Sequence, residues 1–150
     1  MATVQVDTGQ HRPRLISSVL IDSYKDAHAE MLSAIAAMDE LTRDPTPDGL
    51  RLSHTRFRIT RASQECRATF KKVVATLSPD GTPAVARAVD ELERRHSELK
   101  GVTSQHLASW TLSEILSDWP GYCRASADVR HRWRKIIERE RQLLSPLVMR

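Results

Sequence analysis

Residues 118–147 read DWPGYCRASADVRHRWRKIIERERQLLSPL, the longest stretch of the chain in which apolar residues recur with the period of an α-helix. The face that we expect to be buried consists of Trp119, Cys123, Ser126, Val129, Trp133, Ile136, Ile137, Leu143, Leu144 and Leu147. This stretch therefore predicts a long helix with one apolar side, against which the rest of the chain packs. Four of its residues, Trp119, Trp133, Ile137 and Leu144, are expected to be buried together with Tyr24, Met31, Leu92 and Leu99.

A single carboxylate interrupts this apolar side. Glu140 follows Ile136 by four positions and precedes Leu144 by four, so all three share one side of the helix. A buried carboxylate must be paired, hydrogen-bonded or protonated, because an isolated charge in an apolar interior is costly. The partner of Glu140 is therefore the main question that the sequence raises about function.

Composition favours an all-helical protein. The chain has 150 residues, only five glycines and 5% aromatic residues, and this length fits one domain with a core of its own. Its two cysteines, Cys66 and Cys123, are far apart and form no CxxC pair, so neither a disulfide framework nor a cysteine zinc site is expected. No long apolar run suggests a secretory signal or membrane span, and we expect a cytoplasmic protein without membrane contact.

Turn signals divide the chain into a tail and four helices. Residues 1–13 are polar and predict a flexible tail, and residues 14–150 predict one domain. Pro47 and Pro83 each follow a threonine, a pattern typical of a helix start with Thr46 or Thr82 as the cap. The expected helices span residues 15–43, 47–77, 83–109 and 118–147, with at most one helical turn in the link before the last helix. Asp118 is the expected cap of that last helix, ahead of Pro120.

Short links between long helices determine the topology. A short link cannot carry the chain back along a helix of this length, so consecutive long helices must run antiparallel. The sequence therefore predicts an up-down-up-down four-helix bundle. The apolar face of residues 47–77 is the least regular, because four arginines alternate with its proposed members Leu50, Phe57, Ile59, Ala62, Cys66, Phe70, Val73 and Leu77.

The last helix also resembles a known family. Glu140 is followed by Leu144 and then by Pro146. This spacing is similar to the last-helix signature of the hemerythrin-like, or HHE cation-binding, family, in which a ligand histidine precedes the glutamate by four positions. Ile136 occupies the place of that histidine here.

The likeness extends, more loosely, over residues 15–147. Glu65 matches the glutamate of a similar motif in the second helix, but Arg61 replaces its histidine, and His28 resembles the first-helix ligand. The resemblance implies a bundle that binds two iron atoms for oxygen or small-molecule binding and sensing. Because Ile136 and Arg61 remove metal donors, we expect no cofactor and a regulatory or interaction module with an unknown protein partner.

The remaining polar residues allow two interpretations. In the first, the protein is a sensor that holds a single iron or zinc ion, for which the candidate ligands are His28, Glu65, His96, His106 and Glu140. In the second, metal is absent and a buried polar cluster consists of Arg61, Glu65, Glu140 and His28. We favour the second, with Arg61 as the partner of Glu140.

Other functions find less support in the sequence. The stretch from His96 to Gly101 resembles a histidine phosphotransfer motif, but one extra residue changes its spacing and His96 falls on the apolar stripe of its helix. The net charge of +4 results from 23 basic and 19 acidic residues, and no recognition motif for nucleic acid accompanies it. No nucleophile lies beside a base, so an enzyme is not expected.

Overall fold

The computed structural model describes residues 17–77 and 81–148, with side chains up to residue 144. These residues form five helices and no strand: α2 (Ser18–Arg43), α3 (Gly49–Leu77), α4 (Pro83–Ser109), α5 (Leu112–Ser117) and α6 (Trp119–Val148). The prediction of an all-helical protein is confirmed. The predicted tail and the first residues of the predicted first helix lie outside the described part.

Two of the predicted helix starts are confirmed by their caps. The Thr82 side chain accepts a hydrogen bond from the backbone N–H of Val85 at 3.2 Å, and Pro83 is the first residue of α4. At the start of α6, the Asp118 carboxylate accepts from the N–H of Gly121 at 3.0 Å. Each cap satisfies an N–H group that the first turn of a helix leaves without a partner.

The start of α3 differs from the prediction. Thr46 does not cap this helix, because its N–H and hydroxyl both donate to the carboxylate of Asp44. Asp48 takes the capping role and accepts from the N–H of Arg51 at 3.1 Å. The helix therefore begins two residues later than expected, at Gly49.

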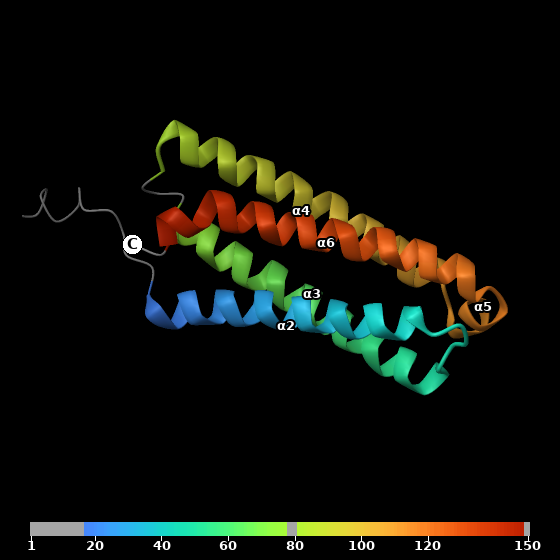
Figure 1. Cartoon of the computed structure of the whole chain (residues 1–150). Helices are drawn as coiled ribbons and strands as arrows, with labels where there is room; N and C mark the ends of the chain where they lie inside the picture. Colours follow the sequence, from blue (N-terminus) through green and yellow to red (C-terminus); the bar gives the residue numbers. More distant parts are fainter. Residues whose placement is uncertain (1–16, 78–80, 149–150) are drawn as a thin grey trace, which may run out of the picture.

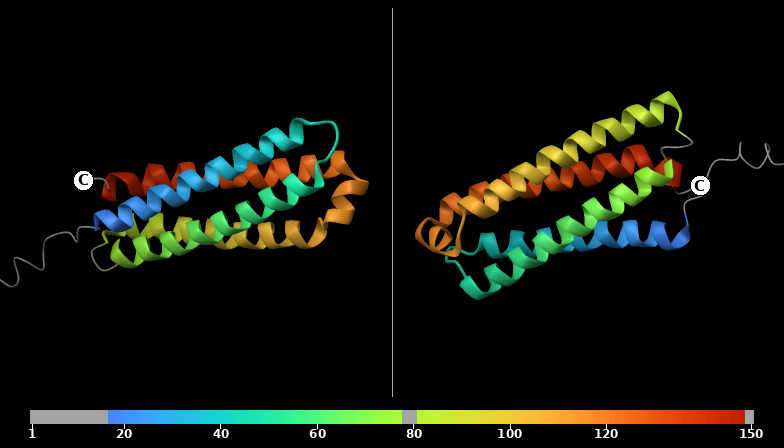
Figure 2. Two further views of the ribbon diagram at one scale, coloured as in Figure 1. Left: turned by 90° about the horizontal axis from the view of Figure 1, so that it is seen from below. Right: turned by 180° about the vertical axis from the view of Figure 1, so that it is seen from behind.

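The four long helices lie alongside one another as two pairs (Figure 1). α2 packs mainly on α3, and α4 packs mainly on α6. Between the two pairs, α2 and α6 are in more extensive contact than α3 and α4. Further views show the short α5 at one end, between the end of α4 and the start of α6 (Figure 2). α3 and α4 touch each other little, which leaves a seam between them.

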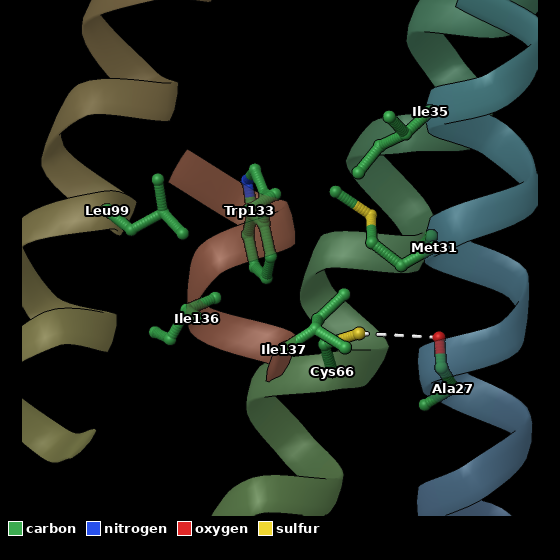
Figure 3. Packing of buried hydrophobic residues seen from close by; sticks show 9 residues of the cluster. Ala27, Met31, Ile35, Cys66, Leu99, Trp133, Ile136 and Ile137 are labelled. Atoms are coloured by element: carbon green, nitrogen blue, oxygen red, sulfur yellow. Dashed lines mark hydrogen bonds between the residues drawn. The ribbon is translucent and has the colours of Figure 1, made fainter. Parts of the chain in front are cut away.

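The expected apolar core is largely present. The eight residues for which mutual burial was predicted are all buried: Trp119, Trp133, Ile137, Leu144, Tyr24, Met31, Leu92 and Leu99. Figure 3 shows the central layer, where Trp133 and Ile137 of α6 lie between Leu99 of α4 and Met31 of α2. The face predicted for α3 is wrong at its first turns, since Leu50 and Phe57 are 84% and 61% exposed.

At one end of the molecule, a long-range hydrogen bond and an aromatic contact join the end of α2 to the start of α6. The indole N–H of Trp119 donates to the backbone carbonyl of Asp44 at 2.9 Å, which satisfies an oxygen just beyond α2. Trp119 stacks on Tyr122, a buried residue that the predicted face of α6 did not include.

None of the described helices combines the length and the apolar character that crossing a membrane requires.

Candidate functional site

Glu140 lies at the centre of the packed helices. The residue is 1% exposed, and it sits on α6 between the buried Ile136 and Ile137 on one side and the buried Leu144 on the other. The burial predicted from its position in the apolar stripe is therefore confirmed. A carboxylate at this depth needs partners, because water does not reach it.

Two histidines from two other helices surround this carboxylate. Nε2 of His28, on α2, lies 3.2 Å from Oε2 of Glu140, and His28 is the donor because an ionised carboxylate can only accept. Nε2 of His96, on α4, lies 3.5 Å from Oε1, which is an ion-pair contact without hydrogen-bond geometry. All three residues are buried, and we refer to His28, His96 and Glu140 as the core cluster.

The histidines keep Glu140 ionised in spite of its depth. Burial acts to raise the pKa of Glu140, but the hydrogen bond from His28 and the neighbouring His96 imidazole outweigh it. The pKa of this carboxyl therefore lies below its ordinary value. The cluster thus joins a buried carboxylate to two imidazoles across three helices.

Aromatic rings hold the two imidazoles in place. His96 stacks on Phe70 of α3 with the ring centres 4.3 Å apart, and Trp133 meets its edge at 6.3 Å. His28 lies against the Tyr24 ring at 4.3 Å. Because the rings are packed on several sides, neither imidazole can turn away from Glu140 without repacking its neighbours.

α3 contributes a thiol to the same region. Cys66 is 1% exposed, and its sulfur donates to the backbone carbonyl of Ala27 at 3.4 Å (Figure 3). Burial, with the negative charge of Glu140, raises the pKa of Cys66 to about 12. The thiol thus stays protonated near neutral pH and is unsuited to nucleophilic attack.

Arg61 does not take part in the core cluster, so the predicted pairing of Arg61 with Glu140 is wrong. Arg61 and Glu65 are both exposed, and the guanidinium of Arg61 lies 5.9 Å from the centre of the Phe57 ring. The physical reason is the register of α3: Ala62 and Cys66, one position further along, face the core. Residues 61 and 65 share an exposed side of the helix, about 100° away, because they are four apart.

Of the five candidate metal ligands, only His28, His96 and Glu140 come together, in the core cluster. Glu65 is on the surface, and His106 stacks on Tyr122 with ring centres 5.5 Å apart. Burial and the positive charges of Arg56 and Arg130 lower the pKa of His106 to about 4. Across the described residues, no group of three or more histidine, cysteine, aspartate or glutamate side chains is arranged to hold a metal ion.

We compared the chain with known proteins in three ways. No family model, curated protein or solved structure matches it.

A second charged group was missed by the sequence analysis. Arg130 is 8% exposed, and both it and Arg134 donate to the carboxylate of Asp39 on α2. Arg130 also donates to the backbone carbonyl and the hydroxyl of Ser126, each at 3.2 Å. The sequence held a usable signal, because Ser126 was assigned to the buried face and Arg130 follows it by four positions. We call Asp39, Arg130 and Arg134 the Asp39 cluster.

Proposed function

We propose that this protein is a hemerythrin-like, up-down-up-down four-helix bundle that works as a regulatory or interaction module. In this proposal the core cluster replaces the metal centre of such bundles. The observation that carries it is the direct contact of Glu140 with His28 at 3.2 Å, by which two polar groups that could bind metal satisfy each other. The imidazoles stabilise the charge of the carboxylate without a cation, although Oε1 of Glu140 and both ring nitrogens of His96 have no hydrogen-bond partner.

A role without catalysis agrees with the chemistry of the buried groups. The thiol of Cys66 remains protonated, and the His28 Nε2 is engaged by Glu140. His96 is only 6% exposed, whereas a histidine that receives a phosphoryl group must be reached by a partner protein. These residues therefore support a structural or signalling role of the core rather than acyl or phosphoryl transfer.

A metal-binding sensor is the second candidate, and one observation favours it. The core cluster brings two imidazoles and a carboxylate, a donor set suited to iron or zinc, from three helices to one place. A bound ion would have to break the contact between His28 and Glu140 and take both groups as ligands. The protein would then respond to oxygen or a related small molecule through the metal, as the family resemblance implies.

Metal analysis separates the two candidates. The full chain, purified without chelator or affinity tag, is analysed for iron and zinc and then titrated with Fe(II) and Zn(II) while thermal unfolding is followed. We expect no stoichiometric metal and no metal-dependent rise of the melting temperature. One or two equivalents of iron or zinc, lost in Glu140→Gln but kept in Glu65→Gln, would refute the metal-free proposal.

A further inference from the structure

A hollow of about 250 Å³ opens in the seam between α3 and α4. Arg67, Phe70 and Lys71 line it from α3. Its other side is formed by residues of α4, namely Glu93, His96, Ser97 and Lys100. Of the three residues of the core cluster, only His96 lines this hollow.

The cations of this hollow lack carboxylate partners. Among the described residues, Arg67, Lys71 and Lys100 form no ion pair, in contrast to Arg58, Arg95 and Arg139, which each bind a glutamate. Nη1 of the half-buried Arg67 is shielded from solvent and has no hydrogen-bond partner. An unpaired guanidinium nitrogen that is already removed from water has lost hydration without receiving a compensating bond.

A histidine beneath these cations is also incompletely bonded. The side chain of His96 is 7% exposed, and its Nδ1 has no hydrogen-bond partner in the structure. Nε2 points to Glu140, so Nδ1, on the other side of the ring, remains for a further partner. Arg67 and His96, the residues that carry these unpaired nitrogens, both line the hollow.

Charge and size define the ligand that would satisfy these groups. Three cations, Arg67, Lys71 and Lys100, face a single carboxylate, Glu93, and this excess of two positive charges matches a dianion. A phosphate monoester carries about two negative charges at pH 7 and suits the planar donors of an arginine. A hollow of about 250 Å³ is below the usual range for large ligands, which excludes a dinucleotide.

We propose that the seam between α3 and α4 binds a small phosphate monoester, with Arg67 as the main phosphate ligand and Lys71 and Lys100 as supporting cations. The non-phosphate part of the ligand lies toward Phe70, whose ring stacks on His96. This site does not depend on the proposed function of the core. Its occupation would hold α3 against α4, where the helices otherwise touch little.

The test is a titration of the full-length protein, at constant ionic strength, with inorganic phosphate, glycerol 3-phosphate and sodium chloride. Backbone amide NMR shifts are followed. We expect saturable shifts around Arg67 and Ser97 with glycerol 3-phosphate, a dissociation constant of about 1 mM or lower, and weaker binding of inorganic phosphate. No saturation, or the same shifts with chloride, would overturn the site, and equal affinity for the two phosphates would overturn the ester assignment.

Matched variants locate the binding. Arg67→Gln should weaken glycerol 3-phosphate binding about tenfold or more, since a charge-assisted contact is lost. Arg61→Gln, an exposed arginine of the same helix, should leave it unchanged. Lys100→Gln, on the surface of α4, should weaken binding without affecting folding, and Lys72→Gln is its control. The proposal would be overturned if Arg67→Gln and Lys100→Gln changed the affinity for glycerol 3-phosphate no more than their controls do. None of these outcomes depends on metal content.

Discussion

Glu140 and Asp39 are two carboxylates that both bind residues of another helix, yet they are stabilised by different cations. Glu140 is fully buried and meets imidazoles, whose charge depends on protonation, whereas Asp39 is partly exposed and meets two guanidiniums, which are always charged. Both carboxyl groups have a pKa below the ordinary value, although burial acts to raise each of them. The two carboxylates therefore differ in burial and in the groups that stabilise them, imidazoles of two helices for Glu140 and two guanidiniums of α6 for Asp39.

Removal of a partner of Glu140 should have the largest effect. His28→Leu leaves a buried carboxylate with only the longer contact to His96, and we expect a loss of about 3 to 5 kcal/mol in the free energy of unfolding. Urea denaturation of the wild type and the variant measures this change.

A double-mutant cycle of His28→Leu with Glu140→Gln checks that the loss comes from the pair. Residues in contact should give effects that differ from additivity, whereas independent sites add. Additive losses would show that the two side chains do not depend on each other, and the comparison with the Asp39 cluster would lose its basis.

The Asp39 cluster should tolerate a change better. Asp39→Asn removes the charge that Arg130 and Arg134 bind, but solvent and the oxygens of Ser126 remain available to the guanidiniums. We expect a loss of about 1 to 3 kcal/mol that shrinks at high salt, because the Asp39 side chain is 23% exposed. Chemical denaturation at low and high sodium chloride measures it, and a loss as large as that of His28→Leu would contradict the comparison.

A third group, the partly buried His106, should make the stability of the fold depend on pH, although it has no carboxylate partner among the described residues. Its pKa in the folded protein is about 4, below the ordinary value of 6.5, so the unfolded chain takes up a proton first as the pH falls. Stability should therefore decrease between pH 6.5 and 4, by about 1 to 2 kcal/mol since His106 is only partly buried.

The contribution of His106 can be isolated by replacement. His106→Phe retains a ring against Tyr122 and should lose less stability than the wild type over this pH range, as followed by thermal unfolding. An identical pH dependence in both proteins would assign the acid sensitivity to the core cluster instead.

The smallest effect is expected for the residue first proposed as the partner of Glu140. Arg61 is exposed, so Arg61→Met should change the free energy of unfolding by no more than about 0.5 kcal/mol and should be additive with Glu140→Gln. A strong coupling between these two variants, measured by urea denaturation, would place Arg61 near the carboxylate after all.

The sequence predicted best where one pattern dominated. In α6 the apolar period was clear, so the burial of Trp133, Ile137 and Glu140 could be predicted, and the caps at Thr82 and Asp118 were typical. His28 was placed in a buried polar cluster with Glu140, and the contact between these two residues is confirmed.

The errors arose where polar and apolar residues alternate closely. In α3, Arg61 stands next to Ala62, and a shift of one residue turns a helix position by about 100°, so the pattern did not show which of the two faces the core. Arg130 was left out of the predicted buried face, because an arginine is buried only when partners are available and its partner Asp39 lies on another helix. Such long-range pairs depend on how the helices are placed.

The pairing of α2 with α3 and of α4 with α6 also has a consequence for how the protein opens. Helix pairs that pack closely tend to separate from one another as cooperative units, so the boundary between the two pairs is where partial unfolding would begin. His28 belongs to the first pair, and Glu140 and His96 belong to the second. The contacts within the core cluster therefore hold the two helix pairs together across this boundary. Protection of the backbone amides of α2 and α6 from hydrogen exchange reports how strongly these contacts oppose the separation of the pairs.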